Sequence, residues 1–216
     1  MSIVSLKNIN KKFDNKVIFK DFNLEVDEGE FLCITGVSGA GKSTLLNIIG
    51  MLEKPDSGTL EINGVTNPRF NSAKGIGLLR NTISYLFQNY GLIEEETVIY
   101  NLKVATHYLH YSNEERNKKI AEALEKVGLM GYEKKKVYQL SGGEQQRVAM
   151  AKILLKPSKL VLADEPTGSL DGANRDEVLG LLQEMNKNGR TIIVVTHDPQ
   201  VDAYATKHLV IGGDNK

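Results

Sequence analysis

Residues 31–50 read FLCITGVSGAGKSTLLNIIG and pass from an apolar run through a glycine-rich turn into a second apolar segment. The run FLCIT, at 31–35, is apolar without alternation, which is typical of a strand covered on both faces of a sheet. The segment TLLNIIGML after the turn is predicted to be a helix. The stretch therefore predicts a buried strand, a tight turn and a helix in succession.

The turn, Gly36–Ser43, fits the pattern G-x4-G-K-S/T with no mismatch. Its glycines let backbone N–H groups turn inward around an anion, and the start of the following helix adds the positive end of its dipole. In such a turn Lys42 reaches the β- and γ-phosphates of a nucleotide, and the Ser43 hydroxyl is a ligand of Mg²⁺. We therefore expect a nucleotide site formed by Gly36, Val37, Ser38, Gly39, Ala40, Gly41, Lys42, Ser43 and Thr44.

Polar residues that suit the same chemistry end two further apolar runs. The run LVLADE ends in Asp164 and Glu165, and successive residues at the end of a strand point in different directions. Asp164 can then face a metal ion while Glu165 faces an attacking water. His197 ends the run IIVVTH and could position that water or sense the γ-phosphate. The alternatives are a surface acid at Glu165 and an ordinary strand-end histidine at His197.

Two more residues are candidates because of where they fall. Gln88 follows the predicted strand 82–87, and its amide could reach Mg²⁺ or the water and still move with the segment beyond it. Phe13 lies in the turn-like stretch KKFDNK, where an exposed aromatic ring could stack on adenine. The alternative for Phe13 is a core or hairpin aromatic residue.

A second glycine-rich turn, LSGGEQQR at 140–147, begins a predicted helix. Ser141 and Glu144 occupy the positions of a capping box, while Gly142 and Gly143 leave the first backbone N–H groups bare for an anion. Glycine in the first turn of a helix lowers the stability of the helix, so the presence of two glycines favours a functional role for this turn. If this turn faces away from Lys42 of its own chain, the simplest arrangement that uses both turns is a two-fold dimer, in which each covers the other's nucleotide.

Composition limits the possible function classes. The 216 residues include 27 Lys and Arg and 27 Asp and Glu, so the formal net charge is zero and no basic surface for nucleic acid is predicted. The single cysteine, Cys33, excludes an internal disulfide and is expected to be a buried apolar residue. With no secretion signal and no apolar run of about 18 residues, the sequence favours a cytoplasmic protein, or one that docks on a membrane partner.

The chain is predicted to be a single α/β domain with a mainly parallel sheet. Strands are expected at 3–9, 22–26, 31–35, 82–87, 159–164 and 191–197. The alternation at 22–26 predicts an antiparallel N-terminal sheet. A helical subdomain at about 89–158 would interrupt a core of 1–88 and 159–216, with one helix capped by Ser112 and Glu115 and ended by Gly128. The charge runs 94–96 and 134–136 are expected to be solvated faces, and the alternative is a docking surface.

The motifs, and the order in which they occur along the chain, resemble those of ATP-binding-cassette (ABC) ATPases. The similarity covers essentially the whole chain. The matching positions are Phe13 as the aromatic residue that stacks on adenine, 36–44 as Walker A, Gln88 as the Q-loop, 140–146 as the signature, 160–165 as Walker B, 169–171 as the D-loop and His197 as the switch histidine.

The resemblance implies a P-loop NTPase core with an antiparallel β subdomain and an inserted α-helical subdomain. It also implies a head-to-tail dimer with two ATP molecules at the interface, and hydrolysis coupled to an integral-membrane permease on the inner face of the cell membrane. The catalytic residues would be Lys42, Gln88, Glu165 as general base, and His197. The metal ligands would be Ser43, Gln88 and Asp164. The further nucleotide contacts would come from Ser141, Gly142, Gly143, Gln145 and Asp171.

Within that family, the stretches STLLNIIGMLEKPDSGTLEING, LFQNYGLI and ADEPTGSLD resemble the branch of macrolide exporters, lipoprotein-release systems and bacteriocin exporters. Ser169 and Lys152 depart from the Asn and Arg that are common there. A mechanical signalling complex is the alternative in the same cassette class. A DNA-repair ATPase would need a coiled coil or zinc-binding cysteines, and a translation factor usually carries two cassettes, so both are disfavoured.

Overall fold

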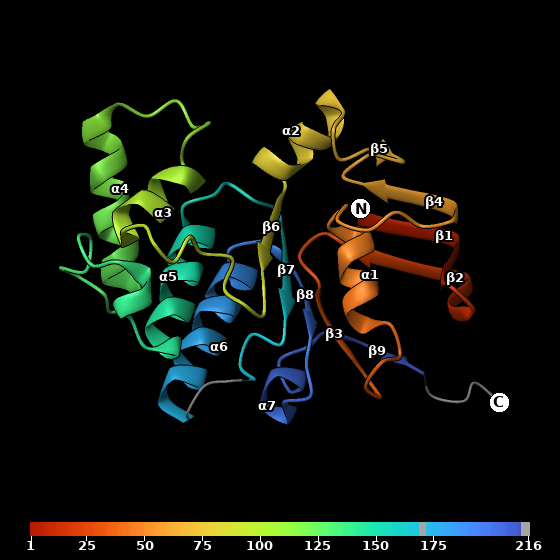
Figure 1. Ribbon diagram of the computed structural model, residues 1–216. Coiled ribbons are helices and arrows are strands. Elements are labelled where there is room, and N and C mark those ends of the chain that lie inside the picture. The colour runs from red at the N-terminus through yellow and green to blue at the C-terminus, as the bar shows by residue number, and fades with distance from the viewer. Residues whose placement is uncertain (169–171, 213–216) are drawn as a thin grey trace.

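The computed structural model describes residues 1–168 and 172–212, apart from the side chain of residue 173. Figure 1 shows a parallel sheet at the centre, an antiparallel sheet on one side and a group of helices on the other. The parallel sheet has the strand order β6-β7-β8-β3-β9. Its strands are β3 (Phe31–Gly36), β6 (Ile83–Leu86), β7 (Leu160–Asp164), β8 (Thr191–Val195) and β9 (Lys207–Ile211). The predicted α/β class is confirmed.

The central strands are apolar throughout because both faces of the parallel sheet are covered. Along β8, Ile192 and Val194 belong to a buried cluster with α5 (Gly142–Leu154) and α6 (Gly172–Lys187). The alternate residues Ile193 and Val195 belong to a second cluster, with α1 (Lys42–Ile49) and the antiparallel sheet. Burial on both faces is what the continuous apolar runs predicted.

The N-terminal sheet is antiparallel, with the order β2-β1-β4-β5. Its strands are β1 (Ser2–Phe13), β2 (Lys16–Asp27), β4 (Ser57–Ile62) and β5 (Val65–Thr66). Phe13 pairs with Lys16 at the end of the β1–β2 hairpin. The alternation at 22–26 therefore predicted the strand type correctly.

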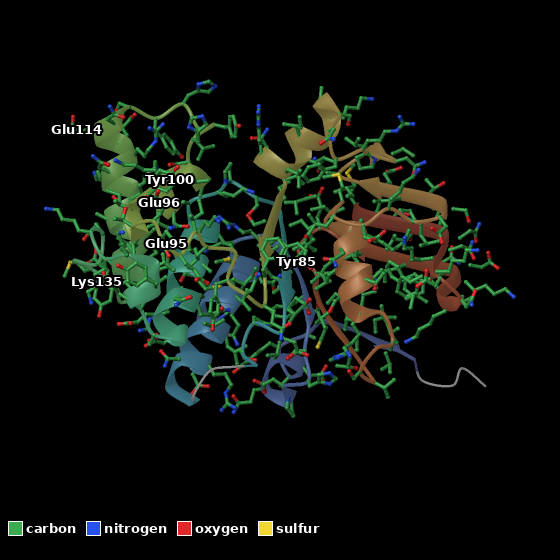
Figure 2. The ribbon with its side chains drawn as sticks, in the orientation of Figure 1. Tyr85, Glu95, Glu96, Tyr100, Glu114 and Lys135 are labelled. Carbon is green, nitrogen blue, oxygen red and sulfur yellow. The ribbon has the colours of Figure 1, made fainter. Side chains whose placement is uncertain are left out.

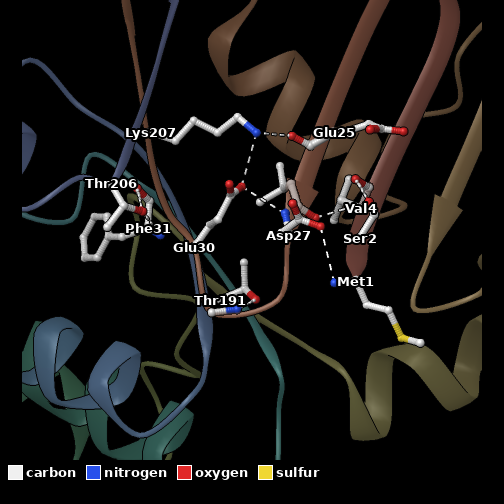
Figure 3. Close-up of polar contacts among 12 residues, drawn as sticks. Met1, Ser2, Val4, Glu25, Asp27, Glu30, Phe31, Thr191, Thr206 and Lys207 are labelled. Atoms are coloured by element: carbon white, nitrogen blue, oxygen red, sulfur yellow. Dashed lines mark hydrogen bonds and ion pairs between the residues drawn. The ribbon is translucent and has the colours of Figure 1, made fainter.

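A set of polar contacts fixes the antiparallel sheet against the parallel one (Figure 3). Glu30, just before β3, accepts hydrogen bonds from the backbone N–H of Asp27 at 2.9 Å and from Lys207 Nζ at 3.3 Å. The Thr191 hydroxyl accepts a bond from the backbone N–H of Gly29 at 2.9 Å. The turn between β2 and β3 is thereby held to β8 and β9, so the hairpin that carries Phe13 has a fixed place beside the turn after β3.

The helical segment lies on the far side of the parallel sheet from the hairpin (Figure 1). It holds α3 (Val98–Ala105), α4 (Asn113–Lys126), a short 3₁₀ helix (Val137–Gln139) and α5. The remaining helices are α2 (Ala73–Asn81), α6 and α7 (Pro199–Asp202). Figure 2 shows Glu95, Glu96, Glu114 and Lys135 on this segment, whereas Tyr85 lies between the sheet and α1 and donates to Asn47 Oδ1 at 2.9 Å. Within the described ranges, each helix is too short or too polar to span a bilayer.

Local signals at the ends of α4 are confirmed. The Ser112 hydroxyl accepts from the backbone N–H of Glu115, and the Glu115 carboxylate accepts from that of Ser112. Gly128, with φ of +66°, follows the last turn. Lys134–Lys136 are exposed, and so are Glu94 and Glu95, while Glu96 is half-buried. The charge runs are thus largely solvated.

Several element ends differ from the prediction, among them the strands β1 and β2, which are longer than the expected 3–9 and 22–26. The helix expected over TLLNIIGML stops at Ile49, because Met51, just beyond the C-cap residue Gly50, takes a left-handed φ of +60°. Strand β8 ends at Val195, so His197 lies two residues beyond it.

Candidate functional site

The turn after β3 has a backbone that admits only glycine at two positions. Gly36 has a φ of +138°, and a Cβ atom there would lie 2.0 Å from the carbonyl oxygen of Ile211. Gly41 has a φ of +103°, and a Cβ there would lie 2.4 Å from Cγ2 of Ile18. The turn is therefore wedged between β9 and β2, and its shape is set by these close approaches.

Lys42 begins α1 and holds its ammonium group inside the turn. The side chain is only 7% exposed, and Nζ donates to the carbonyl oxygens of Gly36 at 2.8 Å and Val37 at 3.0 Å. These bonds fix a positive charge within the glycine-rich loop. A positive charge held inside a glycine-rich backbone turn suits a phosphate group.

Ser43 and Asp164 meet across the space between α1 and the end of β7. Asp164 is half-buried, and the Ser43 hydroxyl lies near its carboxylate. Burial raises the pKa of Asp164 above its ordinary value, although the neighbouring Ser43 hydroxyl and the charge of Lys42 act in the opposite direction. A hydroxyl and a carboxylate side by side are the hard oxygen ligands that Mg²⁺ prefers, so these residues fit the ion.

The buried carboxylate makes stability depend on pH. A folded-state pKa above the unfolded value of about 3.9 means that the folded chain binds the proton more tightly, so stability is lost as pH rises through the raised pKa. We expect Asp164→Asn to have the higher free energy of unfolding at pH 7, with an advantage that shrinks as pH falls through the raised pKa and is absent below about 4. Urea unfolding without nucleotide and with a chelator measures this. A variant less stable than the parent at pH 7 would contradict it.

Glu165 and His197 lie together at the ends of β7 and β8. Glu165 has a φ of +46°, which is uncommon for a non-glycine residue, and its N–H donates to Val195 O at 2.9 Å. Its Oε1 lies 3.6 Å from His197 Nε2, and its Oε2 accepts from the His197 backbone N–H at 3.4 Å. The left-handed backbone therefore sends the carboxylates of Asp164 and Glu165 toward different neighbours.

Gln88 and Phe13 border the same region from two sides. Gln88 lies two residues beyond β6 and lines a cavity of about 500 Å³ together with Asp164 and Asn47. Phe13 is 42% exposed at the end of its hairpin, and the opposite residue, Lys16, donates to Gly39 O at 3.0 Å. The hairpin is thus fastened to the glycine-rich turn.

The second turn, at the start of α5, is an exposed capping box. The Ser141 hydroxyl accepts from the Glu144 N–H, and Glu144 accepts from the Ser141 N–H at 2.8 Å, which lowers the pKa of the Glu144 carboxyl. Ser141 and Gly142 are exposed. A Cβ would lie 3.1 Å from the Tyr90 hydroxyl at Gly142 and 3.1 Å from Asn174 at Gly143, so packing is a second reason for these glycines.

The surroundings of the two turns come from different elements: β2 and β9 at the first, and α6 and the segment after β6 at the second. Gln145, in the first turn of α5, is half-buried and donates to Leu140 O at 3.1 Å. Asp171, the remaining candidate, and the rest of the stretch 169–171 lie outside the described residues.

Gln146, within the stretch 140–146, and Lys16 help to build the site, although the sequence assigned neither of them an individual role. Gln146 is 3% exposed and donates to Pro166 O at 2.9 Å, which ties α5 to the segment after Glu165. A polar residue on the apolar stripe that includes Met150 and Ile153 was the signal for it. The Lys16 contact with the turn had no sequence signal.

Comparison with known proteins agrees with this geometry. The ABC transporter family model matches residues 19–168. The chain is 41% identical over 194 residues to a macrolide export ATP-binding/permease protein of Paracoccus denitrificans, covering 90% of this chain and 29% of that protein. It is 38% identical to the uncharacterized ABC transporter ATP-binding protein YvrO of Bacillus subtilis, covering 97% and 93%.

Solved structures agree as well. The dimeric structure of MJ0796, a bacterial ABC transporter cassette, has a TM-score of 0.88 and 36% identity, covering 96% of this chain and 94% of that one. A dimeric post-hydrolysis state of MJ0796, bound to ADP and phosphate, has a TM-score of 0.87. The chain spans about a third of the length of the macrolide-export relatives that it matches. In sequence and in fold, the chain belongs to the ABC transporter family as an ABC ATPase cassette.

Proposed function

We propose that this chain is the ATP-hydrolysing subunit of a transporter, in which two copies close head to tail on ATP and drive a separate membrane permease. The observation that carries the proposal is the meeting of Lys42, Ser43, Asp164, Glu165 and His197 at one edge of the parallel sheet. These residues come from three strand ends, and their chemistry is that of phosphate binding, metal binding and proton transfer.

Each residue group has a part in hydrolysis. Residues 36–44, which include Lys42, bind the phosphates. Phe13 stacks on adenine. Ser43, Gln88 and Asp164 would hold Mg²⁺, and the bound ion would neutralise charge on the phosphate oxygens. Glu165 orients the attacking water and accepts its proton, and His197, in contact with Glu165, positions that water against the γ-phosphate.

The exposed turn at Ser141 completes the site of a second copy. The partner's Ser141, Gly142, Gly143 and Gln145 would bind the γ-phosphate; Asp171, the remaining candidate for nucleotide binding, lies outside the described residues. Two features support this arrangement. The turn is solvent-exposed and surrounded by other elements than those of the first turn, and the related cassette MJ0796 is dimeric in its solved structures. Hydrolysis would release the copies, because only the γ-phosphate is bound from both sides.

The work of the subunit would be export or release of a peptide, lipoprotein or drug. The support is the similarity to macrolide-export proteins, whose names join an ATP-binding part to a permease part. The match to YvrO covers nearly all of both chains, and that protein is named as an ATP-binding protein alone. The cassette would then lie at the cytoplasmic face of the membrane, with the helical segment and the residues after Gln88 against its permease.

Nucleotide binding is tested by its effect on folding. ATP with Mg²⁺ at a hundred times its Kd should raise the free energy of unfolding by about 2.7 kcal/mol, because ligand binds the folded chain only. Urea unfolding with and without ATP measures the gain. Lys42→Ala should lose most of it, whereas Lys12→Ala, an exposed lysine on β1, should keep it. An equal gain in the Lys42 variant would contradict the proposed phosphate site.

A further inference from the structure

Lys11 is a buried lysine beside an exposed aromatic ring. It lies two residues before Phe13 on β1, near the end of the hairpin. Its side chain is 7% exposed, and Nζ lies over the Phe13 ring, 4.7 Å from the centroid. An ammonium group at that distance interacts favourably with the negative face of the ring.

The ammonium is held in place by the loop that follows α1. Nζ lies 2.6 Å from Glu53 Oε1 and 3.6 Å from Asp56 Oδ1, and it donates to Lys54 O at 3.0 Å. The hydrogen bond to Glu53 raises the pKa of Lys11 against the opposing effect of burial, so the group stays charged. The ammonium group near the ring is thus always charged, and residues outside the hairpin hold it in place.

One face of the ring is therefore occupied and the ring remains 42% exposed. Lys16, which pairs with Phe13 across the hairpin, donates a hydrogen bond to Gly39 O in the phosphate-binding turn. The loop 53–56, Lys11, Phe13 and the glycine-rich turn form one connected set of contacts. Its exposed surface is an aromatic face at a fixed place beside the phosphate site.

We propose that Lys11 is a positioning residue of the nucleobase site, which holds the Phe13 ring from behind so that its free face receives the base. The inference rests on the proposed stacking role of Phe13. A ring already held in its bound orientation loses less side-chain entropy on binding. An ammonium on the far face also reduces the repulsion between the negative faces of ring and base.

This role has a specific signature. Stacking recognises any base by its face, so the benefit of Lys11 extends to ATP and GTP alike. It does not extend to inorganic tripolyphosphate, which has no base. A lysine that merely stabilised the fold would affect all three ligands equally.

The test is a binding cycle by calorimetry on the whole chain, with Mg²⁺ present. Lys11→Met, which keeps the aliphatic stem, should weaken ATP and GTP about three- to tenfold, the cost of ordering one side chain, and leave tripolyphosphate unchanged. Lys11→Arg should recover most of the loss. Lys12→Met, at an exposed lysine of the same strand, should change nothing. In a Phe13→Ala background, Lys11→Met should have no further effect.

Several results would overturn the inference: an unchanged ATP affinity in Lys11→Met, an equal loss for tripolyphosphate, or an undiminished loss in the Phe13→Ala background. Glu53→Gln, which weakens the hold on the ammonium without removing it, repeats the test if Lys11→Met does not fold, and should show a smaller loss confined to nucleotides. A parent chain that fails to bind ATP, or a Phe13→Ala variant that binds it normally, would instead contradict the proposed function itself.

Discussion

Glu165→Gln is expected to lower the rate of ATP hydrolysis by about 10²- to 10⁴-fold, the usual contribution of a general base, while ATP still binds. The amide keeps the size of the carboxylate but cannot accept a proton from water. Glu165 is suited to this role because its left-handed backbone turns it away from Asp164 and toward His197. Release of phosphate at saturating ATP and Mg²⁺ measures the change.

The matched control is Glu177→Gln, an exposed acid on α6 whose carboxylate lies 3.4 Å from Arg147. It should hydrolyse ATP at close to the parental rate. Turnover in Glu165→Gln equal to that of the parent would show that another group activates the water, and the site would have to be assigned differently.

Ser141→Asp should lower hydrolysis by about 10²-fold or more, the cost of losing one transition-state hydrogen-bond donor, and should leave ATP binding by the single chain nearly unchanged. Aspartate is a good N-cap residue, so α5 remains capped. Its charge would oppose the γ-phosphate of the facing copy, since the Ser141 turn is exposed and directed outward from its own chain's fold.

Ser141→Asn separates charge from capping, because asparagine caps as well as aspartate and is neutral. It should retain much more activity than Ser141→Asp, with the same midpoint of urea unfolding for both. Equal activity in the two variants, or a loss of ATP binding in the single Ser141→Asp chain, would argue against a role in closing the partner's site.

Features that depend on neighbours in the sequence could be predicted from it. The glycine-rich turn, its strand and its helix follow from the spacing of residues 31–50, and the capping boxes at Ser112 and Ser141 follow from a glutamate three residues later. The apolar runs predicted the strands of the parallel sheet that are buried on both faces. Each of these signals is local and repeated over several residues.

Elements with weak local signals could not be predicted in the same way. Helix α2 contains Gly75 and Gly77, which lower its helix propensity, and its start depends on the Ser72 side chain accepting from the Gly75 N–H. Strand β5 is two residues long, and β9 is an edge strand with exposed positions such as His208. Only the neighbouring strands decide that these segments pair.

The same distinction between local and long-range signals applies to the candidate site. Residue types and order identified Lys42, Ser43 and Asp164 as candidates, but not the φ of Glu165. The contact from Lys16 to Gly39 O joins residues 23 apart in sequence, and neither residue type requires it. Contacts of this kind depend on how the two sheets are joined, which no motif records.

The most direct test of the composite site is the mass of Glu165→Gln in solution at saturating ATP and Mg²⁺, measured by light scattering. Two chains that sandwich each triphosphate predict twice the mass of the single chain, returning to one when Ser141→Asp is added to the same variant. A particle that stays at the mass of one chain, or a double variant that pairs as readily as Glu165→Gln alone, would contradict the account.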